Sequence, residues 1–496
     1  MKGFATLDYI AVVVYLLAIA AFGSSFYRRN SSAREYFLGS RSISWLPAGI
    51  SIIAADLSAI SIMGAPAWSF KNNMELVWVA VGYPLMAPLV LLVFVPFYSR
   101  LNLYTAYEYL ERRFSLGVRL FTSGLFQMLR GWHVAVAVYG PALVINMVTG
   151  LPVWACVFIM GFFTTFYTTL GGIKAVIWTD VIQFVTVTTG ILVIFVTAIG
   201  AVPGGFPAAY TAAKAAGKLN LINTSLDPSQ LTTIWSCLAG GMILSLAPLT
   251  TDQAILQRLF TTKSVKDCRQ SVILQSILVV PITFLLYSLG VALYAFYNAY
   301  PDRLHGLPTN NAIVPHFTLA ELPTGISGLV IAAIFAASMA VMSAGINSLT
   351  TASTVDFYQR VFRPNETPEH YARVGRLGTL IWGCLVTFLA LLAEHAGDLV
   401  VAYNRVSSVL SGPMLGIFLL GVLTRRATST GALTGAVCGG LAVIAVMIWT
   451  NWAFFYLGII GVSITIAMGL AVSLFTPPPD ERHTKGLVMG SLEPTP

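Results

Sequence analysis

The chain has 496 residues, of which 56% are hydrophobic and only 10% are charged. Soluble domains carry about 25% charged residues, so this chain has too few charges to cover a water-facing surface of its size. The composition excludes an ordinary soluble protein and predicts an all-α polytopic membrane protein whose surface faces lipid. The five cysteines are scattered singly, without the spacing of a metal site or a disulfide framework.

Thirteen apolar runs are long enough to cross a bilayer, which takes about 20 residues in a helix. Helices are expected because these runs lack strand alternation, and a backbone in lipid must satisfy its own polar groups. The expected spans cover residues 7–27, 44–70, 75–98, 120–148, 152–171, 175–200, 232–256, 271–298, 325–356, 375–395, 398–423, 428–450 and 453–475.

The positions of the Lys and Arg residues predict the orientation of these spans. With the N-terminus outside, 21 of the 28 fall in cytoplasmic loops and 5 fall outside. This asymmetry favours an outside N-terminus and a cytoplasmic C-terminus, and it accounts for the net charge of +8 without a nucleic-acid partner. Compact loops without disulfide spacing favour a bacterial inner membrane.

The second span is interrupted by residues that apolar helices avoid. Between Ser51 and Pro66 it holds three serines, Gly64 and the acid Asp56. A carboxylate at mid-membrane costs roughly 2.5–3.5 kcal/mol on insertion scales, so its presence indicates a function. An unwound helix here would offer carbonyls to a cation and helix ends to a solute. The alternative is a tightly packed helix contact in which Asp56 forms a structural salt bridge.

The seventh span is interrupted in a similar way, five spans after the first. It contains Gly240, Gly241, Pro248, Asp252 and Gln253. Broken helices at matching positions of two halves are a sequence signature of inverted-repeat transporters. A proline kink without a role in transport is the alternative for this span taken alone.

Other polar residues lie inside predicted spans. Arg130 and His133 are three residues apart and share one helix face, Arg405 lies in the eleventh span, and Asp180 lies near the start of the sixth. Residues 343–358, at the end of the ninth span, are rich in hydroxyls. These residues either line a pathway or serve as buried ion pairs, interfacial side chains and packing contacts.

Several motifs, in the same order along the chain, resemble those of the sodium–solute symporter family, which includes carriers of sugars, sialate, proline and monocarboxylates. The matching runs are Ala106 to Phe114, Leu170 to Gln183 with its Trp178-Thr179-Asp180 centre, Asp252-Gln253 with Gln257-Arg258, Ile346-Asn347-Ser348 with Asp356 to Tyr358, and Ser411-Gly412-Pro413 with Leu419-Leu420-Gly421.

The resemblance implies a LeuT fold, a five-plus-five inverted repeat with one helix before the core and two after it. The expected segments are an extra helix and loop (1–43), the transport core (44–424, with repeats 44–200 and 232–424), two peripheral helices (425–476) and a flexible cytoplasmic tail (477–496).

The resemblance also implies ion sites. Ala54, Leu57 and Ala337 fall where the family's main sodium site uses backbone carbonyls, but Ala340 and Val341 replace the two hydroxyl residues that complete it. A second sodium site of some members uses an acid and a hydroxyl, and Asp180 and Ser343 match that pattern.

For the solute, the resemblance assigns Asp56, Ser58 and Ser61 on the first broken helix. His133 falls where sialate carriers place a carboxylate-binding arginine, and Arg405 falls where sugar carriers place a glutamine. A pocket with an acid and a base suits a polyol with a carboxylate, or a zwitterion. In the alternative, Arg405 pairs with Asp56 and the pocket is neutral.

We therefore expect a secondary active transporter that couples sodium to the symport of a small polar solute, such as a sugar, a sugar acid or another carboxylate, by alternating access. A proton-coupled or uncoupled facilitator is the alternative, because of Ala340 and Val341. An enzyme is not expected, since no HExxH motif, metal cluster or nucleophile–base pair is present. The expected partners are the solute and the bilayer, with sodium as coupling ion, no cofactor, and a monomer as one option for assembly.

Overall fold

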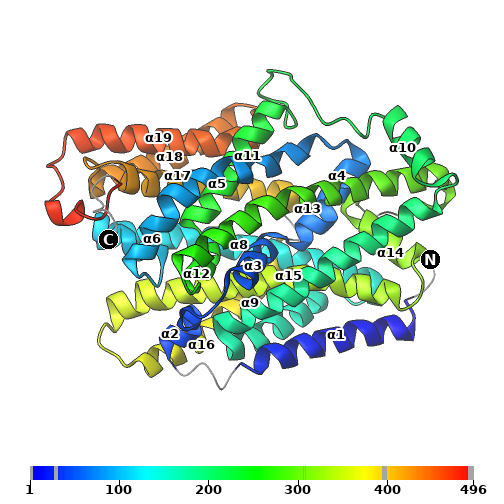
Figure 1. The fold of residues 1–496 in the computed structure, drawn as a ribbon, viewed down its shortest axis with the longest axis horizontal. Helices are drawn as coiled ribbons and strands as arrows, with labels where there is room; N and C mark the ends of the chain where they lie inside the picture. The colour runs from blue at the N-terminus through cyan, green and yellow to red at the C-terminus, as the bar shows by residue number, and fades with distance from the viewer. Residues whose placement is uncertain (1–3, 27–31, 305–306, 308, 394–398, 490–496) are drawn as a thin grey trace.

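The computed structural model describes all residues except 1–3, 27–31, 305–306, 308, 394–398 and 490–496. The described chain is helical apart from its connections, and one isolated bridge pairs Ile43 with Thr262. The long helices lie side by side along the long axis of the molecule, with α1 on one side of the bundle and α18 and α19 on the opposite side (Figure 1).

The helices fall into two halves of the chain, joined by the segment between α10 and α11. The first half contains α1 Thr6–Ser24, α2 Ala33–Leu38, α3 Trp45–Asp56, α4 Ala59–Lys71, α5 Trp78–Leu89, α6 Val95–Leu101, α7 Ala106–Arg113, α8 Leu116–Thr149, α9 Val153–Ala201 and α10 Gly205–Ala215. The second half contains α11 Ile234–Thr251, α12 Gln253–Phe260, α13 Val265–Ala299, α14 Ile313–Glu321, α15 Ile326–Ala352, the π-helix η7 Ser353–Phe362, α16 Pro368–Ala393, α17 Leu399–Leu423, α18 Ser429–Trp449 and α19 Phe454–Leu474.

The expected count of 13 spans is not confirmed. Among the described residues, 11 helices are long and apolar enough to cross a membrane, or 12 if α3 and α4 count as one broken span. The difference arises in α9, whose 49 residues cover both the fifth and the sixth expected spans. Two helices meet inside it at Gly172, where φ is 59° and the backbone is not helical. A straight helix of that length would measure roughly 74 Å, more than twice the ~30 Å hydrocarbon core.

The first expected break lies between α3 and α4, whose axes differ by 57°. Leu57 leaves the helical region with φ −81° and ψ 81°, and Ser58 is extended. The Ser58 hydroxyl accepts a hydrogen bond from the Ser61 amide at 3.4 Å and so caps the start of α4. The serines of this span therefore end one helix and begin the next.

The second expected break lies at Asp252, between α11 and α12. Asp252 has φ −84° and ψ 116°, and its side chain accepts a hydrogen bond from the Ala254 amide at 2.7 Å. Pro248 precedes it within α11 and cannot donate a backbone hydrogen bond there. The two halves of the chain thus each contain one helix that is interrupted at an aspartate.

Helix α15 forms the centre of the bundle, because nearly all of its side chains are buried. Close packing around it depends on glycine: a Cβ on Gly345 would lie 2.1 Å from the Val134 side chain, and one on Gly190 would lie 2.8 Å from Ala333. The N-terminal helix α1 is fixed to the start of α15, since the Asp8 carboxylate accepts hydrogen bonds from the Gly325 and Gly328 amides.

The C-terminal segment differs from the flexible tail that the sequence predicts, as far as it is described. The Tyr109 hydroxyl of α7 donates to the Leu487 carbonyl at 3.1 Å, and the Met489 amide donates to the Val422 carbonyl of α17 at 2.7 Å. Val488 between them is fully buried. This segment therefore packs across two core helices, and residues 490–496 lie outside the described part of the chain.

Candidate functional site

A cavity of about 460 Å³ lies between the two broken helices. Its inner part contains the break residues Asp56 and Asp252, and its outer part contains Lys71, Asn310 and Asn311. We call the end of the bundle where α1 begins and these three residues lie the N-face, and the opposite end, where α6 ends and the tail packs, the C-face. The volume is that of a site for a small ligand, and its position agrees with the mid-membrane solute site expected for interrupted helices.

The guanidinium of Arg130 connects the two breaks. It lies 3.4 Å from the Asp252 carboxylate and donates to the Ala55 carbonyl, at the end of α3, at 3.3 Å. His133, one turn further along α8, lies 3.2 Å from the same guanidinium through its Nδ1 atom. Arg130 is only 2% exposed, and its Nε atom has no hydrogen-bond partner. A buried cation whose ion pair is long is well suited to an anionic ligand.

The carboxylate of Asp56 faces the same cavity. Gln275 of α13 donates to its Oδ2 atom at 3.4 Å, and Tyr83 and Tyr403 also line the cavity. The Tyr403 ring lies beside the His133 ring, with 4.6 Å between centroids. The cavity wall therefore offers carboxylates, hydroxyls, an amide and a guanidinium within one largely apolar enclosure.

Four of the five expected solute residues line this cavity, namely Asp56, Ser58, Ser61 and His133. The fifth, Arg405, does not line it and is exposed, whereas its neighbours Tyr403 and Asn404 do. One residue along a helix turns the side chain by about 100°, so an ungapped alignment that is off by one position selects the wrong face of α17. A neutral pocket made by an Arg405–Asp56 pair is not what the structure contains.

Three further residues line the cavity that the sequence reasoning does not assign to the solute. Asp252 was noted only as part of a break. Arg130 was noted only as a charged residue in a span. Gln275 is a single amide in an apolar span, and nothing in the chain around it indicates that it meets Asp56, which is 219 residues away.

The positions expected for the main sodium site lie at the first break and on the central helix. Ala54 and Ala337 are buried, and Leu57 is the residue at which α3 ends. Ala340 and Val341 are buried as well, with 1% and 0% exposure, so apolar groups occupy the places of the family's hydroxyl pair. Sodium prefers oxygen ligands, and this set supplies them only from the backbone.

The second expected ion position, Asp180, is fully buried in α9. Its Oδ2 atom accepts hydrogen bonds from Ser51 at 2.5 Å and from Arg258 at 2.8 Å. Its Oδ1 atom has no hydrogen-bond partner, and the same is true of both amide atoms of Gln183, one turn further along. The Ser343 hydroxyl donates to the Ala340 carbonyl at 3.1 Å. A buried carboxylate oxygen without a partner is an unusual feature, and a cation is one ligand that would satisfy it.

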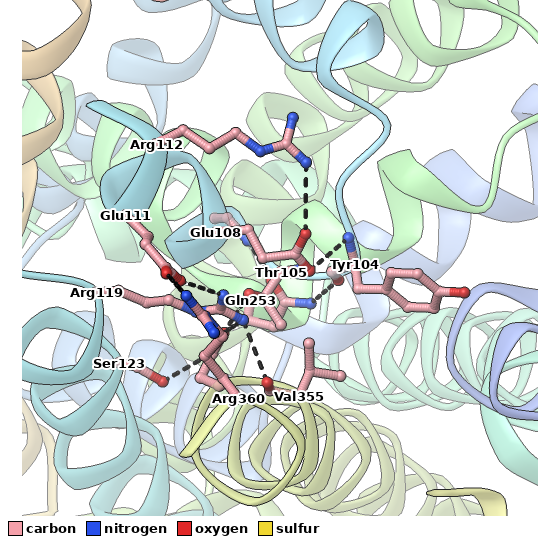
Figure 2. A network of polar contacts seen from close by, with 12 residues as sticks. Tyr104, Thr105, Glu108, Glu111, Arg112, Arg119, Ser123, Gln253, Val355 and Arg360 are labelled. Atoms are coloured by element: carbon pink, nitrogen blue, oxygen red, sulfur yellow. Dashed lines mark hydrogen bonds and ion pairs between the residues drawn. The ribbon is translucent and has the colours of Figure 1, made fainter. Parts of the chain in front are cut away.

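On the C-face side of the cavity, a polar network holds four elements together (Figure 2). Asp356 of η7 binds Arg119 of α8 at 2.6 Å and accepts hydrogen bonds from Thr105 at 2.6 Å and from Ser123 at 2.8 Å. Gln253 of α12 joins the same region, because its amide donates to the Tyr104 carbonyl and accepts from the Ala106 amide. The cavity therefore extends to the N-face, and this polar network closes it toward the C-face.

Glu111 of α7 forms the outer part of this network. Its carboxylate lies 2.8 Å from Arg119 and 2.6 Å from Arg360. Burial opposes ionisation of Glu111, but the hydrogen bonds from the two arginines outweigh it and lower the pKa of this carboxyl below its ordinary value. The C-face is thus closed by charge-assisted bonds between α7, α8 and η7.

Known proteins are similar to this chain in both sequence and fold. The model of the sodium:solute symporter family matches residues 36–439. The chain is 34% identical to a sodium/sialic acid symporter of Aliivibrio fischeri, over 94% of this chain and 93% of that protein. It is 30% identical to a sodium/sialic acid symporter of Proteus mirabilis, over 96% and 97% of the two chains.

Among solved structures, a Na⁺-coupled sialic acid symporter in a substrate-bound outward-open state is similar, with a TM-score of 0.90, 29% identity and coverage of 96% of this chain and 99% of that one. A transporter of the nucleobase-cation-symport-1 family shares the fold at a TM-score of 0.58 and 16% identity, over 91% and 97% of the two chains. These likenesses bear out the LeuT-like fold that the motifs predict.

Proposed function

The chain belongs to the sodium:solute symporter family, and on that premise we propose that it couples sodium entry to the uptake of a small polar solute with a carboxylate group. The observation that carries this proposal is Arg130, a buried arginine that lines a cavity between two broken helices and whose ion pair with Asp252 is long, at 3.4 Å. The family and its relatives are transporters with sodium as the coupling ion, not enzymes.

The cavity chemistry supports a sugar acid as the solute. A carboxylate on Arg130 would gain a charge-assisted bond that the 3.4 Å pair with Asp252 supplies only weakly. Hydroxyl or amine groups of the same solute would meet Asp56, Gln275 and Ser58. The sialic acid named for the relatives has both kinds of group, and it is the first solute to test. In this proposal Arg130, one turn from His133, binds the solute carboxylate in place of the arginine that sialate carriers have at the His133 position.

We assign one sodium ion to the neighbourhood of Asp180, with Ser343 and Gln183. Support comes from the unpartnered Oδ1 atom of Asp180 and the unpartnered amide of Gln183. The set of Ala54, Leu57 and Ala337 is the weaker candidate, because Ala340 and Val341 add no side-chain oxygen to its backbone carbonyls. A coupling ion acts by binding one conformation better than the other.

The proposed cycle is alternating access with the N-face outside and the C-face in the cytoplasm of a bacterial inner membrane. In the described conformation the cavity reaches the N-face at Lys71 and Asn310 and is closed by the Asp356 network at the C-face. This is an outward-open arrangement, as in the similar symporter. Solute and sodium would enter here, and the opening of the C-face network would release them inside.

The test is uptake of labelled sialate, sugars, amino acids and monocarboxylates into proteoliposomes with a sodium gradient, a proton gradient or no gradient. We expect accumulation of an acidic sugar only with sodium, and its loss in Asp180→Asn and Ser343→Ala. Asp227→Asn, in an exposed loop, is the matched control and keeps transport. Equilibration without accumulation under every gradient would overturn the proposal, and accumulation driven by protons alone would replace its coupling ion.

A further inference from the structure

A second cavity lies near the C-face, apart from the solute pathway. Its volume is about 170 Å³, and it lies between α6, the end of α11, α12 and the start of α13. Its inner wall is apolar and buried, with Phe94, Leu249 and Leu256 at 0–1% exposure. The volume is more than ten times the ~10–15 Å³ that one water molecule needs, so the cavity has room for part of a larger ligand.

The hydroxyl groups in its wall already have hydrogen-bond acceptors within the protein. Ser99 donates to the Pro96 carbonyl at 3.0 Å, and Thr262 donates to the Leu259 carbonyl at 2.7 Å. Because these groups are already satisfied within the protein, the inner part of the cavity is suited to hydrocarbon rather than to a polar solute.

Two cations lie at the outer end of the same cavity. Arg41 is partly exposed and Lys263 is exposed, in contrast to the buried wall. Backbone hydrogen bonds hold their segments together: the Ile43 amide donates to the Thr261 carbonyl, and the Lys263 amide donates to the Ile43 carbonyl, both at 3.1 Å. Asn102 also accepts a 2.5 Å hydrogen bond from Arg41. The fold therefore holds the segments that carry the two positive charges together at one mouth of the cavity.

From this geometry we propose that the second cavity binds an anionic membrane lipid, with its phosphate on Arg41 and Lys263 and part of one acyl chain among Phe94, Leu249 and Leu256. Basic pockets between transmembrane helices at a cytoplasmic surface bind anionic headgroups by the same physics. The lipid would brace α12 from the side opposite the solute. This inference does not depend on the identity of the solute or the coupling ion.

The test measures binding to the delipidated full-length protein by native mass spectrometry and by the shift in its thermal unfolding midpoint. The probes are phosphatidylglycerol, phosphatidylcholine with the same chains, and inorganic phosphate. We expect phosphatidylglycerol to bind and stabilise, and Arg41→Ala with Lys263→Ala to weaken its binding roughly thirtyfold, as the loss of two interfacial cations predicts. The matched control is Lys266→Ala with Arg269→Ala, which removes two exposed cations of the same region that do not line the cavity.

The site of the acyl chain is tested separately by Cys268→Leu, which adds a larger side chain to the cavity wall and leaves both cations in place. We expect weaker binding of phosphatidylglycerol, although the substitution leaves the net charge unchanged. Equal binding of phosphatidylcholine, an equal shift with inorganic phosphate alone, or unchanged lipid binding in the Cys268 variant would each overturn the proposal. Both cations are solvent-accessible, and Lys263→Ala alone gives a second reading with less risk to the fold.

Discussion

Arg130 and Asp252 form an ion pair in the wall of the large cavity, with 3.4 Å between Nη1 and Oδ2. Because Asp252 is the residue at which α11 ends and α12 begins, this pair ties the cation of α8 to the second broken helix. A carboxylate that binds Arg130 competes with Asp252 for the guanidinium. In the proposed transport cycle, solute binding would thereby be linked to the helix break that has to rearrange for release.

The first prediction follows from that competition. Arg130→Gln weakens binding of the acidic solute roughly 10–100-fold, the loss of one charged hydrogen bond, whereas Asp252→Asn tightens it by freeing the guanidinium. Isothermal titration of the purified protein with the transported solute measures both. Arg405→Gln, on the exposed face of α17, is the matched control and leaves affinity unchanged. Weaker binding in Asp252→Asn would contradict the competition.

A second prediction concerns the packing of α5 against α11. A Cβ on Gly82 would lie 2.1 Å from the carbonyl carbon of Gly241, a distance at which backbone must move. We expect Gly82→Ala to destabilise the protein by about 1–3 kcal/mol through overpacking. Gly124→Ala has open space around its Cβ and serves as the control. The thermal unfolding midpoint in detergent distinguishes the two variants. Equal midpoints would show that α5 and α11 can move apart without loss of stability.

The third prediction concerns Asp356, whose carboxylate is fully buried against Arg119. Removal of one partner from a buried ion pair costs about 3–5 kcal/mol, because the other charge is left uncompensated. Asp356→Asn is therefore expected to lower the unfolding midpoint strongly and to open the C-face to thiol reagents. Asp480→Asn, whose pair with Arg482 is exposed, is expected to cost under about 1 kcal/mol. Similar midpoints for the two variants would count against a structural role for the network.

The fourth prediction is a pH dependence at Glu111. Its pKa in the folded protein is lowered, so its ionised form stabilises the folded state above the ordinary glutamate pKa, and this stabilisation is lost as pH falls through the lowered value. The unfolding midpoints of the native protein and of Glu111→Gln should differ most at neutral pH and converge only as the pH falls below the ordinary glutamate range. A difference that grows on acidification would reverse the assigned sign.

The two broken helices were predictable from sequence because their cause is local. Serines, a proline, glycines and an aspartate within one apolar span interrupt a helix through their own backbone and side-chain preferences, whatever the rest of the fold is. The long helix α9 was divided into two spans for a similar reason, since Gly171 and Gly172 stand at the boundary. In the structure the backbone at Gly172 is not helical, and two helices of α9 meet there.

The contacts between distant helices were not predictable in the same way. The approach of Gln275 to Asp56 and the pair of Arg130 with Asp252 depend on how α13 and α8 pack against the breaks, and a single sequence does not encode that in any local pattern. Arg405 was assigned to the cavity by register alone, and a shift of one or two residues places Tyr403 and Asn404 there instead. The docked tail depends on two apolar residues, Leu487 and Val488, in an otherwise polar segment.

That tail has a consequence for biosynthesis. The hydrogen bond from Tyr109 to Leu487 joins residues 378 positions apart. At about 5–20 residues per second, a ribosome that has made Tyr109 needs roughly 20–75 s more to deliver its partner. During that interval α7 waits in the membrane interface without the segment that will cover it. The C-face is thus completed only after α19 has been made, and a ribosome that stalls before Leu487 leaves an inserted carrier with this side incomplete.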